Sequence, residues 1–189
     1  MDLWHRTEEE LGELGLPPPF WAFAWAGGQA LARYILENKP LVAGKRILDF
    51  ACGGGVVGIA AMLAGATTCH AVDVDPFAIE AGRLNADLNG VSVTFEQRDI
   101  TGNSAVDEDV LFCGDVFYDR AMAEKVLTFL DRILENGIPV LVGDPGRSYL
   151  PGERLELLAT YSIPNVGAME DNEVKRSSVF RLHPAGQAF

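Results

Sequence analysis

The stretch Asp49-Phe50-Ala51-Cys52-Gly53-Gly54-Gly55 ends a strand-like run, Lys45 to Phe50, and leads directly into a helical pattern over Val56 to Leu63. A second strand-like run, Cys69 to Val74, carries an acidic tripeptide, Asp73-Val74-Asp75, at its end. A strand, a glycine-rich turn, a helix and a second strand that ends in an acid are typical of a nucleoside site at the carboxyl edge of a parallel sheet. This stretch therefore predicts a doubly wound α/β fold that binds a nucleoside.

The glycines of this stretch leave two kinds of cofactor open. Gly53, Gly55 and Gly58 match the dinucleotide fingerprint G-x-G-x-x-G, which predicts an NAD- or FAD-binding oxidoreductase. Asp49 argues against that interpretation, because a carboxylate beside the turn would repel a pyrophosphate that needs free backbone N–H groups. S-adenosylmethionine has no phosphate and carries an ammonium and a sulfonium group. The site chemistry therefore favours an S-adenosylmethionine-dependent methyltransferase and keeps the oxidoreductase as the alternative.

Composition and charge restrict the class of protein. At 189 residues, with 48% hydrophobic and 22% charged residues, we expect one domain over 1–189, with an N-terminal helical segment (1–40) and a Rossmann-like core (41–189). The net charge of −12 argues against nucleic-acid binding. This acidity either keeps the protein soluble or steers a lysine-bearing partner toward the site. No apolar run suits a membrane span, and Met1 to Arg6 lacks a signal-peptide pattern. We therefore expect a cytoplasmic monomer with no membrane partner.

The cysteines and histidines predict neither a disulfide framework nor a metal site. The cysteines lack C-x-x-C spacing and lie in or beside apolar runs, which predicts reduced, buried thiols: Cys52, Cys69 and Cys113. Cys52 is expected to line the cofactor loop as a wall. The histidines are scattered along the chain: His5, His70 and His183.

The remaining pattern alternates strands and helices. Helices are predicted over Asp2 to Leu14, Phe20 to Leu36, Pro76 to Leu88 and Asp119 to Leu134. Strands are predicted over Val91 to Gln97, Asp109 to Cys113, Ile138 to Gly143, Leu155 to Ile163 and Ser177 to Leu182, with a polar loop from Asn165 to Arg176. This order predicts a Rossmann-like, doubly wound, seven-stranded and mostly parallel sheet with an antiparallel C-terminal hairpin strand.

Acidic residues follow the second and third strands, where a nucleoside would lie. Asp73 is predicted to accept both ribose hydroxyls, whereas Asp75 either contributes to the site or caps the helix that begins at Pro76. Asp99 and Ile100 follow the third strand, where we expect an adenine ring. Asp99 would accept the exocyclic amine, or it is a simple turn acid.

The fourth strand is followed by Asp115-Val116-Phe117-Tyr118. Ligands in open α/β sheets bind outside the carboxyl ends of the strands, so this tetrapeptide should face the reacting group. Phe117 is assigned to the core. Asp115 is assigned to the site, with helix capping as the alternative.

At this point the chain resembles the seven-β-strand, Rossmann-like S-adenosylmethionine-dependent methyltransferases, in which acids recur in the order of Asp49, Asp73, Asp99 and Asp115. Asp115-x-x-Tyr118 resembles the protein lysine methyltransferase branch. The segments 20–34 and Gly143-Asp144-Pro145-Gly146-Arg147 are similar to the electron-transfer flavoprotein β-subunit lysine methyltransferases, over nearly the whole chain. The resemblance implies methyl transfer to a lysine of that subunit. A small-molecule N-methyltransferase and a catalytically silent binding module stay open as alternatives.

The expected roles follow from these motifs and the resemblance. Asp115 and Tyr118 are the expected catalytic residues: Asp115 orients the lysine ammonium, and Tyr118 holds the amine or Asp115. Trp25 either walls the cofactor or belongs to the core. Ala51 replaces the first glycine of the usual loop, which is tolerable if its φ is negative. The expected cofactor-binding residues are Trp25, Asp49, Ala51, Cys52, Gly53, Gly55, Asp73, Val74, Asp75, Asp99 and Ile100.

Overall fold

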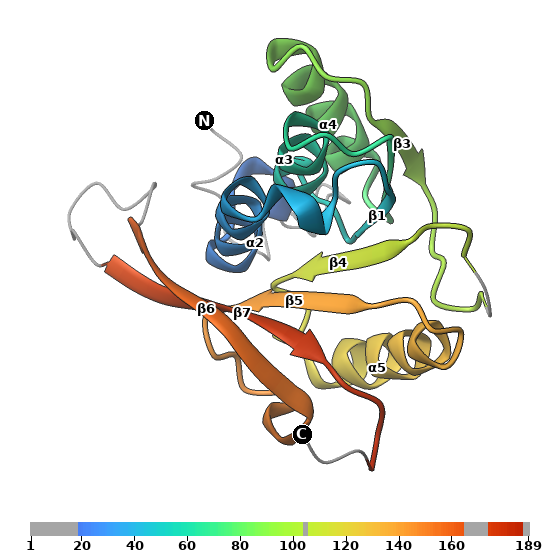
Figure 1. The fold of residues 1–189 in the computed structure, drawn as a ribbon, viewed down its shortest axis with the longest axis vertical. Helices are drawn as coiled ribbons and strands as arrows, with labels where there is room; N and C mark the ends of the chain where they lie inside the picture. Colours follow the sequence, from blue (N-terminus) through green and yellow to red (C-terminus); the bar gives the residue numbers. More distant parts are fainter. Residues whose placement is uncertain (1–18, 104–105, 165–173, 187–189) are drawn as a thin grey trace, which may run out of the picture.

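The computed structural model describes residues 19–103, 106–164 and 174–186. Within them, seven strands form one mixed sheet in the order β3-β2-β1-β4-β5-β7-β6 (Figure 1). The strands are β1 (Arg46–Phe50), β2 (Thr68–Asp73), β3 (Thr94–Gln97), β4 (Val110–Gly114), β5 (Val140–Asp144), β6 (Leu155–Pro164) and β7 (Val174–Leu182). The first five strands pair in parallel, and β7 pairs antiparallel to β5 and β6. The predicted mostly parallel sheet with its antiparallel C-terminal hairpin is confirmed.

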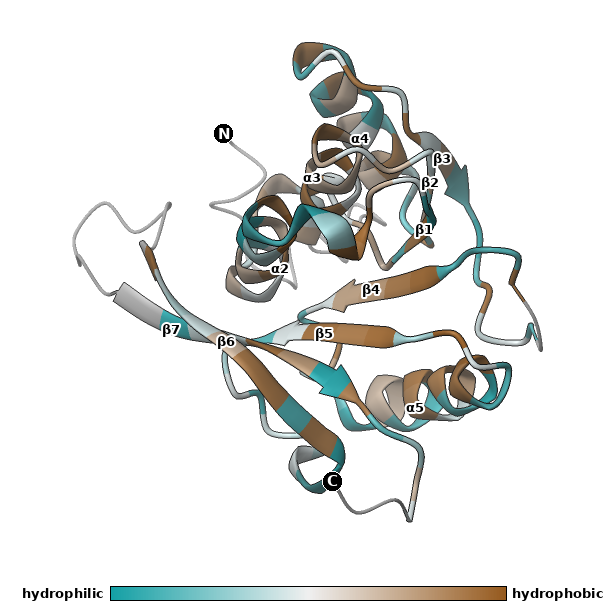
Figure 2. Cartoon of the chain, viewed as in Figure 1, coloured by the Kyte–Doolittle hydropathy of each residue, from teal (hydrophilic) through white to brown (hydrophobic). Residues whose placement is uncertain are grey.

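Helices cover both faces of this sheet (Figure 1). The α-helices are α2 (Ala26–Glu37), α3 (Val56–Leu63), α4 (Pro76–Leu88) and α5 (Arg120–Glu135). Successive strand residues point to opposite faces. In β4, Phe112 packs in the cluster that contains α2 and α3 residues, while Cys113 packs in the cluster of α5. Because both faces are covered, β4 and β5 are almost wholly buried and strongly hydrophobic, as Figure 2 shows.

The switch in strand order between β1 and β4 positions the site. The chain leaves β1 for β2 on one side, whereas β4 pairs with β1 on the other. A crevice therefore opens outside the carboxyl ends of these strands, where ligands bind in doubly wound sheets. None of the helices within the described residues is long and apolar enough to cross a bilayer.

The predicted helix over Phe20 to Leu36 is wrong at its start. A 3-10 turn, η2 (Phe20–Ala22), precedes an extended segment, and α2 begins only at Ala26. The indole N–H of Trp25 donates to the carbonyl of Phe20 at 2.7 Å, and Trp25 has extended angles. This bond holds the aromatic segment in its own turn, outside the helix.

Other boundaries differ by a few residues. β3 begins at Thr94 rather than Val91, and β7 begins at Val174 rather than Ser177. Two further 3-10 turns are η3 (Lys39–Leu41) and η4 (Gly152–Arg154). The expected helix over Asp2 to Leu14 and residues 165–173 of the predicted loop lie outside the described residues.

Candidate active site

A cavity of about 610 Å³ opens at the carboxyl ends of β1, β2 and β4. Most of the predicted site residues line it: Trp25, Ala51, Gly53, Asp73, Val74, Asp75, Asp99, Asp115 and Tyr118. A neighbouring cavity of about 400 Å³ is lined by Asp49 and Cys52 and shares Trp25, Gly53 and Asp115 with the first. Gly55 and Ile100 line neither cavity. Gly55 lies against the ring of Phe95, and Ile100 is buried in the core.

Asp49 belongs to β1, and its side chain contacts the first turn of α3. Its Oδ2 accepts the N–H of Gly58 at 2.8 Å, and any Cβ on Gly58 would lie 3.2 Å from that oxygen. Burial raises the pKa of Asp49 to about 8, so the carboxyl is largely protonated near neutral pH. The N-terminus of α3, which would hold a pyrophosphate in a dinucleotide site, is occupied by a side chain instead. This geometry agrees with the preference for a cofactor without phosphates.

The glycine turn corrects the expectation for Ala51. Ala51 has φ +54°, in the left-handed region, and not the negative φ that the sequence suggested. Backbone bonds impose this conformation, because the N–H of Cys52 donates to Val72 at 3.1 Å and the N–H of Gly55 donates to Cys52 at 2.8 Å. The turn therefore stores strain beside the cavity, which residues at functional sites often do.

Asp73 and Asp75 have separate structural tasks. Asp73 accepts the N–H of Gly53 at 2.9 Å on Oδ2 and the N–H of Asp75 at 3.0 Å on Oδ1. Each of its oxygens retains a lone pair that can accept a hydroxyl. Asp75 caps α4 by accepting the N–H of Phe77 at 2.8 Å. The capping alternative for Asp75 is therefore confirmed, although the residue also lines the cavity.

Asp99 is held by its own turn and by α5. It accepts from the N–H and the hydroxyl of Thr101, at 3.0 and 2.6 Å, and from Lys125 Nζ at 2.6 Å. The hydrogen bond from Lys125 is the main cause that lowers the pKa of Asp99 to about 2. The turn interpretation is confirmed, and a role toward adenine stays a prediction.

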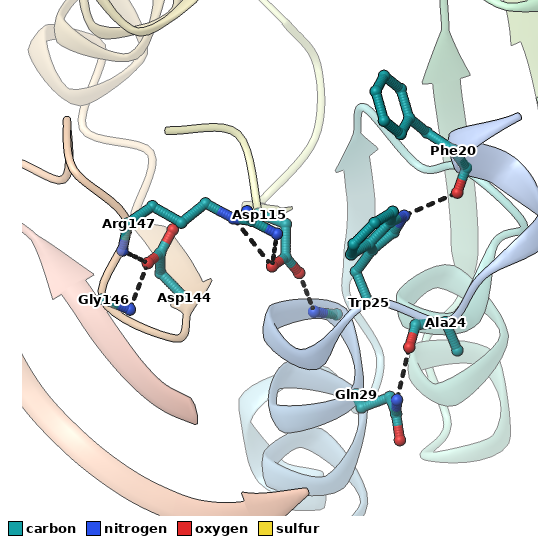
Figure 3. A network of polar contacts seen from close by, with 9 residues as sticks. Phe20, Ala24, Trp25, Gln29, Asp115, Asp144, Gly146 and Arg147 are labelled. Atoms are coloured by element: carbon teal, nitrogen blue, oxygen red, sulfur yellow. Dashed lines mark hydrogen bonds and ion pairs between the residues drawn. The ribbon is translucent and has the colours of Figure 1, made fainter. Parts of the chain in front are cut away.

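Asp115 is the buried centre of a network that joins three parts of the chain (Figure 3). Its Oδ2 accepts the N–H of Gly28, in the first turn of α2, at 3.0 Å. Its Oδ1 accepts from Arg147 Nε at 3.2 Å and Nη2 at 2.8 Å. Asp119, not Asp115, caps α5 by accepting the N–H of Met122. Asp115 therefore does not cap the helix that follows it in the sequence. It accepts an N–H from the first turn of α2 instead, a contact that the sequence spacing did not indicate.

Glycines allow α2 to come this close. A Cβ on Gly27 would lie 2.2 Å from the carbonyl oxygen of Gly143 and 2.5 Å from Asp115 Oδ2. A Cβ on Gly114 would lie 2.9 Å from the backbone nitrogen of Gly28. These distances are shorter than van der Waals contact, so the backbones of α2, β4 and β5 can meet only at glycines.

Arg147 is a site residue to which the sequence assigned no role. Asp144, at the end of β5, accepts the N–H groups of Gly146 and Arg147 at 2.7 Å each and so fixes the turn. The guanidinium lies 5.6 Å from the Trp25 ring and 5.9 Å from the Tyr118 ring. The sequence signal was the segment Gly143-Asp144-Pro145-Gly146-Arg147, but only the fold directs its arginine to Asp115.

Aromatic rings complete this end of the cavity. Phe20 lies 6.0 Å from Trp25 and 5.8 Å from Tyr118 between ring centroids. Trp25 is half-buried and lines both cavities, so it is a wall residue and not a core residue. Burial raises the pKa of Tyr118, which keeps its hydroxyl protonated. Phe117 is fully buried in the core, as predicted.

Among the described residues, the other titratable side chains form no candidate metal site. No group of three His, Cys, Asp or Glu side chains suited to a metal occurs in the part of the chain that the structure describes. The three cysteines are free and buried, as the sequence predicted. Burial raises the pKa of each thiol, so these groups are unreactive core residues.

Known proteins share this architecture. A family model described as ribosomal protein L11 methyltransferase (PrmA) matches residues 29–135. The structure of an RNA methyltransferase from Salinibacter ruber, in complex with S-adenosyl-L-homocysteine, is 19% identical with a TM-score of 0.57, and covers 84% of this chain and 93% of that one. The fold is thus the Rossmann-like fold of methyltransferases.

Sequence relatives define the family more narrowly. An electron transfer flavoprotein beta subunit lysine methyltransferase from Xenopus laevis is 38% identical over 97% of this chain and 76% of its own length. The protein of that name from Rattus norvegicus is 37% identical over 97% of this chain and 70% of its own length. The chain belongs to the electron transfer flavoprotein beta subunit lysine methyltransferase family. The expected family and enzyme class are confirmed.

Proposed function

We propose that this enzyme transfers a methyl group from S-adenosylmethionine to a lysine of the β-subunit of electron transfer flavoprotein. The observation that carries the proposal is one cavity with Asp73 at one end and the Asp115 network at the other, in a member of this family. We further propose one domain over 1–189, a cytoplasmic location and a monomer. A protein substrate fits an aromatic rim in which the Tyr118 side chain is exposed.

The residues present fit S-adenosylmethionine. A cavity of about 610 Å³ has the size of a ligand site for a nucleoside with an amino-acid tail. The free lone pairs of Asp73 suit the ribose hydroxyls, and the exposed side chain of Val74 offers apolar contact to a base. Asp49 can lose its proton when a cation arrives, and its carboxylate then balances the charge.

When bound, S-adenosylmethionine supplies the methyl group: the lone pair of the lysine nitrogen forms the new N–C bond, and the sulfur retains the electron pair of the C–S bond that breaks. The protein must present this amine in its neutral form. A lysine of ordinary pKa is neutral in about one molecule in a thousand near pH 7, which costs roughly 4 kcal/mol. Asp115 and the hydroxyl of Tyr118 orient the amine, and its proton leaves to water. Trp25 excludes water from the wall of the site.

Purified protein, labelled S-adenosylmethionine and the isolated flavoprotein β-subunit test this proposal. We expect label in the β-subunit and at least about 100-fold slower transfer with Asp115→Asn, because the amine loses its orienting carboxylate. Asp109→Asn is the matched control, since this acid pairs with Arg46 at the opposite end of the strands. Label in small amines but not in the β-subunit would favour the small-molecule alternative. Full activity of Asp115→Asn would refute the role of Asp115.

A further inference from the structure

Arg147 pairs with Asp115, the carboxylate that the proposed function uses to orient the substrate. It forms a two-pronged ion pair with Asp115, in which the side chains are 24% and 8% exposed. The pair is therefore largely removed from solvent. Charges in such a partly buried position interact more strongly than charges at the surface. The backbone N–H of Arg147 donates to Asp144, and the guanidinium of Arg147 lies beside two aromatic rings. The arginine is built into the site and is not a surface side chain.

The remaining charges around Asp115 make this pairing important. The titratable groups from neighbouring elements are acidic: Asp73 on β2, Asp144 on β5, Asp119 at the start of α5, and Asp49 on β1, whose carboxyl is largely protonated. The other cations of the cavity pair elsewhere, Lys125 with Asp99 and Arg98 with Glu96. Arg147 is thus the cation that offsets Asp115 among the described residues lining this cavity.

An unpaired Asp115 would work against the reaction. A carboxylate beside a lysine favours the ammonium form and raises the lysine pKa by about 1–3 units. Each unit reduces the neutral, reactive fraction about tenfold near pH 7. A carboxylate that already pairs with a guanidinium can still accept a hydrogen bond, but it exerts little net charge on the amine.

We propose that Arg147 is a positioning residue that neutralises Asp115, so that Asp115 orients the incoming lysine amine without stabilising its protonated form. This inference rests on the proposed function. It predicts that loss of the arginine charge strengthens binding of the substrate cation and weakens transfer, two effects of opposite direction. A purely structural arginine would weaken both.

Arg147→Gln tests the inference with two measurements. Calorimetry without cofactor should show that the unmodified flavoprotein β-subunit binds the variant at least about threefold more tightly at pH 7, because Asp115 is uncompensated. The rate of transfer at saturating substrate should fall at least about tenfold at pH 7 and recover as the pH is raised by about one unit or more. Weaker binding, or a loss of rate that is equal at every pH, would overturn the inference.

Three further variants separate charge from folding. Arg147→Lys retains the charge and should keep the pH profile of the wild type, even if the rate falls. Arg147→Gln in an Asp115→Asn background carries no unpaired charge and should bind substrate no more tightly than Asp115→Asn alone. Arg46→Gln removes the guanidinium from a two-pronged but exposed pair with Asp109, far from the cavity, and should change neither measurement.

The outcomes also distinguish this inference from the proposed function. If the wild type labels no β-subunit, the proposed function fails. If the wild type is active but Arg147→Lys shifts the pH profile as far as Arg147→Gln does, only the inference fails. The melting temperature of each variant shows whether it is folded. If Arg147→Gln is unfolded, the Arg147→Lys and double variants decide whether the charge of Arg147 matters.

Discussion

The two ends of the cavity differ in how far apart in the chain their hydrogen-bond partners lie. At the nucleoside end, Asp73 bonds a backbone N–H two residues away, and so does Asp99. At the other end, Asp115 bonds Gly28 across 87 residues and Arg147 across 32 residues. Each acid of the first end combines this local bond with one distant donor, Gly53 for Asp73 and Lys125 for Asp99. Both donors to Asp115 are distant in the chain, so the second end exists only when α2, β4 and β5 have docked.

This difference assigns different sensitivities to the two ends. Local turns keep most of their geometry when the packing around them changes, because their hydrogen bonds connect near neighbours. The Asp115 network depends on backbones that meet at glycines, and packed interiors do not yield to an added methyl group without cost. We therefore expect packing changes to affect methyl transfer before they affect nucleoside affinity.

Gly27→Ala should break the Asp115 end most severely. The new methyl would lie 2.2 Å from the Gly143 oxygen and 2.5 Å from Asp115 Oδ2, so α2 must move away. We expect a loss of stability of about 3 kcal/mol and a fall in transfer of at least about 100-fold, caused by displacement of the network. Chemical denaturation and label transfer measure the two effects.

The control for this variant is Gly152→Ala, because a Cβ there meets nothing within 4 Å. That substitution should leave both quantities nearly unchanged. If Gly27→Ala is as active as the wild type, the close approach of α2 is not required and the comparison between the two ends fails.

The hydrogen bond of Asp49 is intermediate in sequence separation, because its partner Gly58 is nine residues away. Burial raises its pKa from 3.8 to about 8, so its protonated form favours the folded state. This contribution is fully present below about pH 4 and is lost as the pH rises toward 8. Relative to the wild type, Asp49→Asn should gain stability on the order of 4 kcal/mol as the pH rises from 5 to 8. Urea unfolding at several pH values measures it, and a pH-independent difference would contradict the buried-acid account.

Asp73 and Asp75 allow a test of the nucleoside end, because they are close in sequence but have different hydrogen-bond partners. Asp73→Asn should weaken S-adenosylhomocysteine binding by about 10-fold, through loss of a charged acceptor for the ribose. Asp75→Asn should leave that affinity within about twofold of the wild type, because asparagine is also a good helix cap. Calorimetry tests both variants. Equal losses of affinity would show that both carboxylates hold the ligand.

Ala51→Gly should give the smallest effect. Because Ala51 has φ +54°, a glycine removes left-handed strain but loosens the unfolded chain, so we expect a net gain of about 0.5–1 kcal/mol. Ala64, with φ −85°, is the opposite control, and Ala64→Gly should destabilise the protein. Thermal unfolding measures both changes. A loss of stability with Ala51→Gly would contradict the assignment of strain to this turn.

Much of the nucleoside end could be predicted from the sequence. The glycine turn after β1 and the acids after β2 and β3 follow from patterns within a few residues. At the other end, the same holds for the buried Phe117. The predictions that failed involve conformations set by long-range contacts or side-chain bonds. Trp25 bonds Phe20 and delays α2, and the turn after β1 forces Ala51 into positive φ.

The sequence by itself determined the order of the strands and helices, the acids at the strand ends and the resemblance to a methyltransferase family. These properties depend on periodicity, turn residues and hydrogen bonds between near neighbours, which a linear pattern records. Only the tertiary structure decided that Arg147 pairs with Asp115 and that Gly28 donates to it. The physical reason is that ion pairs and backbone approach depend on separation in space, which the folded sheet sets and spacing in the chain does not.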